Sequence, residues 1–303
     1  MPAFLRSLGW QPISPDTYAV AWHRFGGSVI THPKVLAFIQ EHCDCKPQYL
    51  GRHDRAGNLL AAVATWGNYL AGDKTALEHF GVDRQYDFGS PEVILPLGPA
   101  YKGMLCFRGK YVSSEHAGQL INLSGRNRGR TICLAKDLSP QGMSAKQKGR
   151  RRSELNRCLK SQGRLQPAAE YAPEELVRIY AELYQKRWGQ PLPNQAQLAV
   201  MLQALRAHID GYVLLIEDRP AAFQLLFATQ SDRFYSVEYI NGGVDPAFHD
   251  LSPGTVLTWA NVEHTWQNSQ SLGLAHRYSF GRNSAEYKTR WANESKLMRI
   301  VSW

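Results

Sequence analysis

Cysteine is scarce in this sequence. Five of the 303 residues are cysteine, an odd number, and the chain starts without the basic stretch and apolar core of a secretory signal peptide. Since disulfide frameworks use even sets of cysteines in oxidising compartments, we expect reduced thiols and a cytoplasmic protein. The cluster of His42, Cys43 and Cys45 has no second pair downstream, so partly buried thiols are favoured over a zinc site and no metal is expected.

Long hydrophobic runs are also missing. The most apolar stretches are residues 59–66 and residues 212–227. The first is short, and the second is interrupted by the sequence EDRP at 217–220. A transmembrane helix needs about 20 consecutive apolar residues. Neither stretch is therefore expected to span a bilayer.

Acidic residues are outnumbered by basic ones. The chain has 35 Lys and Arg against 26 Asp and Glu, which gives a formal net charge of +9 and a pI near 9.3. Such a charge favours anionic partners, and it leaves nucleic acid, an anionic membrane surface and a phosphorylated ligand open. The hydrophobic content of 44% and charged content of 20% predict a folded protein with one or two cores.

Periodic patterns in the second half predict a mixed α/β layer. A helix begins at Pro173 and closes at Gly189, and a second one has apolar residues at spacings of three and four over 198–209. Residues 211–243 predict three antiparallel strands separated by the turns EDRP and QSD. Residues 249–303 then predict a helix, a strand (HRYSFG), a short helix (SAEYKTRW) and a last strand (KLMRIVSW). This order indicates helices on both faces of one sheet.

The first half contains a fainter hairpin. Residues 48–66 place two strands around a DRAGN turn, which is similar to the hairpin at 212–227. The likeness indicates a duplicated domain, and a chance match of two common hairpins stays open. We expect a degenerate first domain over residues 1–140 and a second domain over residues 141–303.

The sequence HDLSPGTVL at 249–257 begins the helix of the last segment with an unusual glycine. Serine at 252 suits an N-cap and proline suits the first helical position, whereas glycine costs roughly 1 kcal/mol in a helix. The N–H groups of Ser252, Gly254 and Thr255 lie where a helix start binds anions. The alternative is that Gly254 only permits close packing of the turn.

Residues 146–164 carry the densest charge, with eight Lys or Arg against the single Glu154. Four of the basic residues recur at helical spacing, which predicts a ridge that binds phosphate or lies on anionic lipid; they are Arg150, Arg157, Lys160 and Arg164. A solvated helix face is the alternative. Our candidates for anion or membrane binding are Arg150, Arg151, Arg157 and Lys160.

Several sequence words resemble a known superfamily. LSPGTVL and SFGRNSAEYKTRW, together with the basic helix and the LYQKRW word, resemble GNAT-fold acyltransferases of the cellulose-biosynthesis type and Fem peptidoglycan aminoacyl ligases over residues 140–303. Ser279 stands where those families often have an acidic residue. The piece GWQPISPDTYAVAWHRFGGSVITHPKVLAFI resembles the macrophage-inducible-gene (Mig) family, which is linked to antimicrobial-peptide resistance in Gram-negative bacteria. The resemblance implies tandem GNAT-like domains with a mostly antiparallel sheet.

The resemblance also implies acyl transfer from acetyl-CoA or another acyl-CoA to an amine. This reaction needs a held pyrophosphate, a base and an acid. The helix start at 252–255 is the candidate pyrophosphate site, with Lys288 and Arg290 as further phosphate ligands. Glu238, in an apolar strand whose alternation separates it from Tyr239, is the candidate base, and Tyr287 is the candidate acid.

Each of these residues also has a structural alternative. Glu238 can pair with an arginine, Tyr287 can pack in the core, and Lys288 can face water. Glu263, between Trp259 and Trp266 by helical spacing, is either a buried group that serves the site or a residue at the edge of the apolar arc.

We therefore expect a cytoplasmic acyl or aminoacyl transferase, peripheral on the inner membrane, that modifies an amine of an envelope precursor and so changes how cationic peptides bind. The alternatives are a GNAT-like protein without catalysis that binds anionic lipid or a regulator, and a transcription regulator. No helix-turn-helix pattern is evident, so nucleic acid is not the expected partner. An open cleft between Glu238 and Ser252 distinguishes an enzyme from a binding protein.

Overall fold

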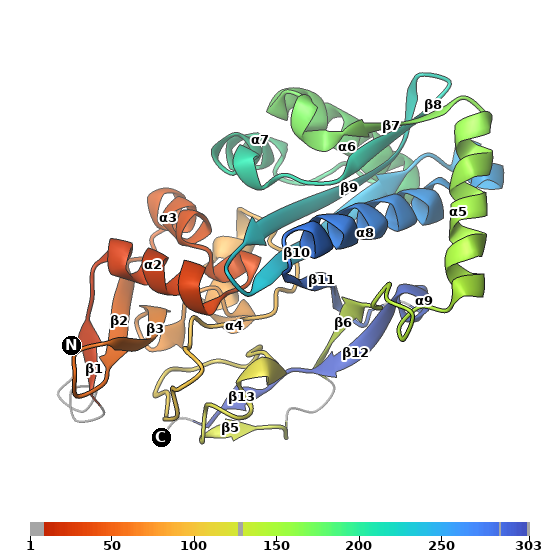
Figure 1. The fold of residues 1–303 in the computed structure, drawn as a ribbon. Coiled ribbons are helices and arrows are strands. Elements are labelled where there is room, and N and C mark those ends of the chain that lie inside the picture. The colour runs from red at the N-terminus through yellow and green to blue at the C-terminus, as the bar shows by residue number, and fades with distance from the viewer. Residues whose placement is uncertain (1–8, 127–129, 285, 302–303) are drawn as a thin grey trace.

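A seven-stranded sheet is the centre of the molecule (Figure 1). The computed structural model describes residues 9–126, 130–284 and 286–301. The strand order is β12-β6-β11-β10-β9-β8-β7, and all neighbours are antiparallel except β10 and β11. The strands are β6 (Thr131–Ala135), β7 (Gly163–Pro167), β8 (Tyr212–Ile216), β9 (Arg219–Gln230), β10 (Phe234–Val244), β11 (Ala275–Arg282) and β12 (Ala292–Lys296).

Helices cover both faces of this sheet, and the strand alternation of β9 shows why. Phe223, Leu225 and Phe227 lie in the core with α6, whereas Ala222 and Leu226 pack under α8. Both faces of β9 are therefore apolar, as a central strand between two helical layers requires. The helices are α5 (Ala145–Lys160), α6 (Pro173–Trp188), α7 (Gln195–Ala204), α8 (Pro253–Ser271) and the short α9 (Lys288–Trp291).

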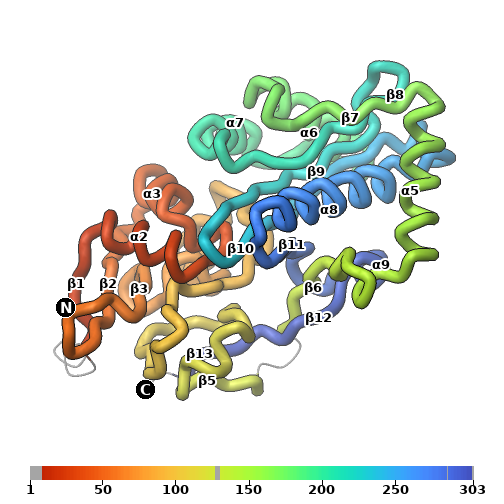
Figure 2. The backbone as a smooth tube through the Cα atoms, in the orientation of Figure 1, coloured from red at the N-terminus to blue at the C-terminus, as the bar shows by residue number. Residues whose placement is uncertain are grey.

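The first half of the chain forms a four-stranded antiparallel sheet with its own helices, and its core is continuous with that of the second half. One apolar cluster contains Trp22 and Val63 as well as Tyr180 and Phe223. The tube of Figure 2 shows the early segments beside the ends of β9 and β10. The elements are β1 (Trp10–Pro12), α2 (Pro15–Phe25), α3 (Pro33–His42), β2 (Pro47–His53), β3 (Leu59–Trp66), β4 (Tyr69–Leu70) and α4 (Lys74–His79).

The predicted mixed α/β layer is confirmed. Helix α6 begins at Pro173 and ends before Gly189, whose φ of 69° is the left-handed conformation of a helix C-cap. The meander β8-β9-β10 and the β2-β3 hairpin form as expected. The division at residue 140 stays a prediction, and β6, which precedes residue 140, lies in the large sheet.

Two strand predictions need correction. Strand β12 was not expected, and the predicted last strand is confined to the two residues of β13 (Arg299–Ile300), which pair with β5 (Leu123–Ser124). Within the described ranges, none of the helices is long and apolar enough to cross a bilayer.

Candidate functional site

The two parallel strands separate part-way along their length. Register pairs β10 with β11 from Phe234–Ala275 to Glu238–Ser279, and both strands continue beyond that point. A β-bulge shifts the register of β10 on its other side between Tyr239 and Asn241. Helix α8 connects the two strands and begins beside the end of β10. In open α/β sheets, ligands bind beyond the carboxyl ends of parallel strands.

A cavity of about 420 Å³ occupies this position. It is bounded by β9, the end of β10, the start of α8, the end of α6, α5 and α9. We call it the α8 cavity, and the lining residues used below are Arg151, Arg187, Gln224, Tyr239, Gly242, Gly243, Asp245, Ser252, Gly254, Thr255, Tyr287, Arg290 and Trp291. The cavity reaches Ser252 but not Glu238, so it differs from the cleft between these two residues that we expected from the sequence.

The start of α8 presents a backbone donor to the cavity. Ser252 is the N-cap, as expected, but it has φ 50° and ψ 54° and its side chain makes no cap hydrogen bond. The Ser252 N–H donates to His249 O at 2.9 Å and the Thr255 N–H donates to Ser252 O at 2.9 Å. Within the described chain, the Gly254 N–H has no acceptor, so it is the donor left for an anion.

Three arginines give the cavity its positive charge. The Arg187 guanidinium lies at the end of α6 and donates to Gly242 O at 2.9 Å. Arg151 lies 4.9 Å over the ring of Trp291 and is paired with Glu154 at 2.6 Å. Arg290 is exposed at the rim. Together with the positive end of α8, these side chains favour an anionic ligand.

Close packing at Gly243 places α6 against this cavity. A Cβ at Gly243 would lie 2.5 Å from the backbone carbon of Leu183, so α6 can approach β10 closely only because residue 243 is glycine. This approach brings Arg187 to the end of β10. Sequence reasoning missed Arg187, although it belongs to the LYQKRW word, because the pattern shows a helix and not its distance from the sheet.

A pair of tyrosine hydroxyls lies inside the cavity. Tyr239 is buried, and its hydroxyl interacts electrostatically with Arg187 and Tyr287. Burial raises the pKa of Tyr239, so the phenol stays protonated near neutral pH. Tyr287, the predicted acid, is half-buried and lines the same cavity. Tyr239 was not predicted, because sequence alternation had marked its neighbour Glu238 instead.

Glu238 lies on the opposite face of β10 and does not line the cavity. Its carboxylate is 4% exposed and accepts a hydrogen bond from Ser279 Oγ at 2.9 Å. Burial raises the pKa of this carboxyl well above its ordinary value. The expectation of Glu238 as base therefore needs correction, because strand alternation turns it away from the cavity. None of the described arginines pairs with Glu238, so the alternative of an arginine pair is not seen in this part of the chain.

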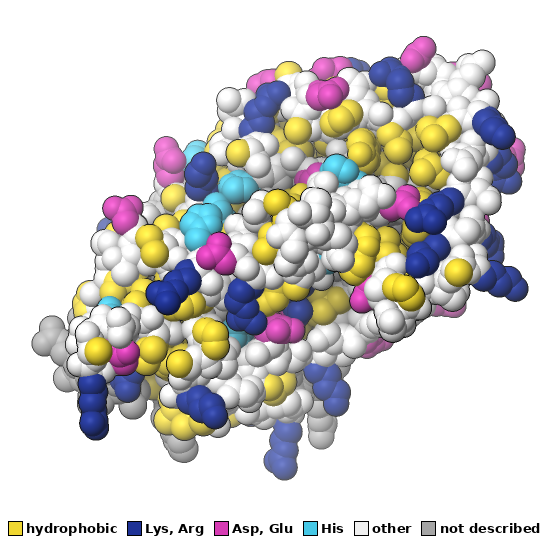
Figure 3. Space-filling view, in the orientation of Figure 1, with side chains coloured by type: hydrophobic (Ala, Val, Ile, Leu, Met, Phe, Trp, Pro, Cys, Tyr) yellow, Lys and Arg dark blue, Asp and Glu magenta, His cyan; other side chains and the backbone are white. Residues whose placement is uncertain are grey.

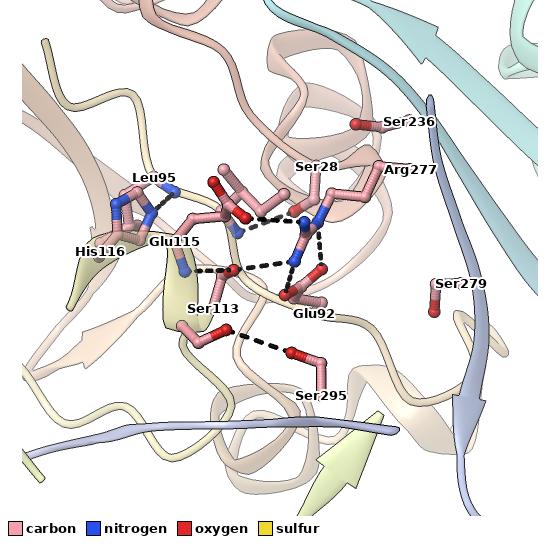
Figure 4. A network of polar contacts seen from close by, with 12 residues as sticks. Ser28, Glu92, Leu95, Ser113, Glu115, His116, Ser236, Arg277, Ser279 and Ser295 are labelled. Atoms are coloured by element: carbon pink, nitrogen blue, oxygen red, sulfur yellow. Dashed lines mark hydrogen bonds and ion pairs between the residues drawn. The ribbon is translucent and has the colours of Figure 1, made fainter. Parts of the chain in front are cut away.

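On this face of the sheet, Arg277 of β11 joins the two halves of the chain (Figure 4). Its Nε donates to Glu92 at 2.7 Å and its guanidinium also reaches Glu115 at 3.1 Å and Ser113 at 3.2 Å. Glu92 is 2% exposed, so its charge needs this partner. Arg277 lies two residues before Ser279 in β11, so the network connects the first half of the chain to the same face of the sheet that carries Glu238.

Lys288 also departs from its predicted role. Its ammonium group is buried and donates to Phe280 O at 2.7 Å, Arg282 O at 2.6 Å and Ser284 Oγ at 3.2 Å. By bonding to these three oxygens, the Lys288 side chain stabilises the end of β11 and the turn that follows it. The geometry gives no support to Lys288 as a phosphate ligand or as a residue that faces water.

The comparison with known proteins identifies the family. A sequence model of the Mig-14 family matches residues 32–300. The chain belongs to the Mig-14 family. None of the curated proteins matches this Mig-14 chain.

Two solved structures with TM-scores above 0.5 share the fold of this Mig-14 protein over most of its length. The structure of FemX is 10% identical and has a TM-score of 0.56, with 96% of this chain and 97% of FemX covered. A conserved protein of unknown function from Bacteroides thetaiotaomicron VPI-5482 is 12% identical and has a TM-score of 0.51, with 97% and 100% covered. A tandem GNAT protein from the clavulanic acid biosynthesis pathway is 10% identical with a TM-score of 0.42, with 96% and 97% covered. The fold is GNAT-like, as the sequence predicted.

The basic side chains of helix α5 in the Mig-14 protein have different surroundings, although the sequence gives them the same charge. Arg150 and Lys160 are exposed, and Arg157 donates to Asp250 O at 3.3 Å. Figure 3 shows Lys and Arg side chains along the edge of the molecule occupied by α5. Arg151 instead belongs to the α8 cavity. Arg164 lies in β7, so its inclusion in a helical ridge is wrong.

The remaining sequence candidates have structural roles. Glu263 is 18% exposed and pairs with Arg152 at 2.9 Å, which places it at the edge of the apolar arc of α8. Cys43 and Cys45 are free and buried, and burial raises the pKa of the Cys45 thiol to about 11. Over the described part of the chain, no group of three His, Cys, Asp or Glu side chains is placed to hold a metal ion.

Proposed function

We propose that this Mig-14 family protein transfers an acyl or aminoacyl group from an anionic donor such as acyl-CoA to an amine. The observation that supports this is the α8 cavity, which lies where β10 and β11 separate and combines a free helix N–H with three arginines. A pyrophosphate would lie at Gly254, with Arg187 and Arg290 as counter-charges. The donor's thioester would extend toward Tyr239 and Tyr287.

The two tyrosines support a role in release of the leaving group. In the transfer, the amine nitrogen forms a bond to the acyl carbon while the carbon–sulfur bond breaks, and the thiolate takes a proton from the Tyr287 hydroxyl. The proton lost by the amine returns to Tyr287 through solvent, so the products are an amide and a thiol. Tyr239 interacts with Tyr287 in the same cavity and would orient its hydroxyl.

The family resemblance supports the identity of the acceptor. We propose an amine of a cell-envelope precursor, modified at the cytoplasmic face of the inner membrane. Because the charge of such an amine influences binding of cationic peptides, its acylation would connect the reaction to antimicrobial-peptide resistance.

Calorimetry with acetyl-CoA tests the donor site. We expect the wild-type protein to bind acetyl-CoA and Gly254→Val to weaken binding by about 10-fold, because the added side chain would keep a phosphate away from the N–H of residue 254 and so cost about one hydrogen bond to a charged group. A Cβ at Gly254 would meet Val244 at 3.2 Å, so the added side chain presses on the cavity wall.

The matched control is Gly149→Val, because Gly149 is a helical glycine of α5 with open space at its Cβ position. This variant should retain wild-type affinity. Absence of acetyl-CoA binding by the folded wild-type protein would contradict an acyl-CoA donor site and favour a binding protein without catalysis.

A further inference from the structure

A second cavity lies where the first half of the chain meets α6 and α7. Its volume is about 190 Å³. We call it the tyrosine cavity, and its polar lining consists chiefly of Asp83, Tyr86, Asp87, Tyr180, Tyr184 and Asn241. Among the described residues, neither Lys nor Arg lines it. In a chain with a net charge of +9, this makes the cavity a local acidic and aromatic site.

Tyr180 supplies a phenol to the lining of the tyrosine cavity. The residue is 3% exposed, its ring packs against Tyr184 at 5.9 Å and Phe223 at 5.6 Å, and it lines the tyrosine cavity. Within the described chain, its hydroxyl makes no hydrogen bond. The oxygen is not among the buried polar atoms that lack a partner, and Tyr180 lines the cavity, so a ligand there can reach the oxygen and donate a hydrogen bond to it.

Asp87 supplies an exposed carboxylate at this cavity, and Lys74 acts on it electrostatically without forming an ion pair. One of its oxygens accepts from the Gly89 N–H at 2.7 Å, and the side chain forms no ion pair within the described residues. Asp83 differs, because Lys74 lies 3.8 Å from it. Desolvation raises the pKa of Asp87, and a cation bound beside it would offset that cost. The Tyr180 hydroxyl and the Asp87 carboxylate interact electrostatically.

We propose that the tyrosine cavity binds an alkylammonium group. The ammonium would donate to the Asp87 carboxylate and to the Tyr180 hydroxyl, and the ring of Tyr184 offers a face to the positive charge. Leu198 and Met201 line the rest of the cavity and suit an alkyl chain. An organic cation therefore matches the lining better than a metal ion, which would need more oxygen ligands.

The position of this site relates it to the α8 cavity. Tyr180 interacts electrostatically with Tyr239 and Arg187 as well as with Asp87. Tyr239 and Arg187 line the α8 cavity, so the last turns of α6 contribute residues to both cavities, although none of the described residues lines both. The bound amine is then the acceptor of the acyl group, and this identification rests on the proposed function. The binding of an ammonium group to the tyrosine cavity does not depend on the proposed function.

Two small probes of equal length test the site in the intact protein. We expect ligand-observed NMR to show binding of n-butylammonium and at least about 10-fold weaker binding of n-butanol, because only the ammonium forms a charged hydrogen bond. Asp87→Asn should weaken n-butylammonium binding by about 10-fold on the same grounds. Asp232→Asn, in the exposed turn between β9 and β10, is the matched control and should bind as the wild type does.

Tyr180→Phe separates hydrogen bonding from packing. Phenylalanine keeps the ring contacts but removes the hydroxyl, so a weaker affinity for n-butylammonium with an unchanged thermal midpoint supports the proposal. Equal affinity of the wild type for n-butylammonium and n-butanol, or unchanged n-butylammonium affinity in Asp87→Asn, would overturn it.

Acetyl-CoA titrations on the same samples separate this inference from the proposed function. Asp87→Asn should bind acetyl-CoA like the wild type, because Asp87 does not line the α8 cavity. If the wild type binds acetyl-CoA and not n-butylammonium, the ammonium site is wrong and the proposed donor site stands. If it binds n-butylammonium and not acetyl-CoA, the ammonium site stands and the acyl-CoA proposal fails.

Discussion

Glu238 and Tyr239 are consecutive residues of β10 with opposite surroundings. The sequence correctly predicted that they point to opposite faces, since alternation is a property of any strand. It assigned the chemistry to Glu238, whereas the α8 cavity contains Tyr239. Alternation separates two faces but does not say which one meets a cavity, because that depends on where α6 and α8 pack.

This residue-scale distinction predicts different effects of two small substitutions. Tyr287→Phe should lower kcat by about 100-fold, the usual contribution of a general acid, while acetyl-CoA affinity changes little. Glu238→Gln should leave kcat within about 3-fold, because this carboxyl bonds to Ser279 on the other face of the sheet. Steady-state kinetics with each folded variant measures both. A 100-fold loss in Glu238→Gln would restore Glu238 as the base and contradict the geometric assignment.

At the scale of elements, the sequence predicted best where one residue pattern determines one element. Helix α6 has its amphipathic spacing and Gly189 within a single segment. Strand β12 reads ANESK and has no apolar alternation to reveal it. It forms because it pairs with β6, from Ala292–Ala135 to Lys296–Thr131, a contact between segments far apart in the chain. A pairing between distant segments cannot be predicted from the sequence of either segment alone.

Helix α5 gives an element-scale prediction about anionic lipid. Arg150 and Lys160 are exposed, although Arg150 also pairs with Glu154 at 3.1 Å, whereas Arg151 is half-buried and lines the α8 cavity. We expect the double variant Arg150→Glu, Lys160→Glu to sediment less with vesicles that contain anionic lipid, because each basic residue near such a surface contributes about 1 kcal/mol. Neutral vesicles should bind neither protein.

Salt provides the control for this experiment. Electrostatic attachment should fade as ionic strength rises, since the Debye length is about 8 Å at 0.15 M and about 3 Å at 1 M. Wild-type protein that ignores anionic vesicles even at low salt would show that α5 does not attach the protein to a membrane.

At the scale of the whole molecule, the two halves share one apolar core, so we expect acid to destabilise both halves together. His32 and His116 belong to the first half and are both buried. Burial lowers the pKa of His32 to about 3 and that of His116 to about 4. Nε2 of His116 accepts a hydrogen bond from the Leu95 N–H at 2.8 Å, so protonation would remove the acceptor that this amide needs (Figure 4).

The direction of the pH effect follows from the protons bound in each state. The folded pKa values lie below the ordinary value of about 6.5, so the unfolded chain binds more protons as the pH falls below 6.5. The contribution of each neutral histidine is complete above pH 6.5 and is lost progressively toward pH 4 and then 3. For each of the two histidines, lowering the pH from 7 to 5 should reduce the free energy of unfolding by about 1 to 2 kcal/mol. Urea titrations at the two pH values measure this loss.

His116→Gln provides the decisive comparison, with the exposed His249→Gln as its control. Glutamine does not titrate, so His116→Gln should be less stable at pH 7 but should lose less free energy of unfolding between pH 7 and pH 5 than the wild type does. His249→Gln should keep the wild-type pH dependence. Because one apolar cluster includes both halves, the urea transition should move as a single step at both pH values. Equal pH dependence in the wild type and His116→Gln would show that burial of this neutral imidazole does not determine acid sensitivity.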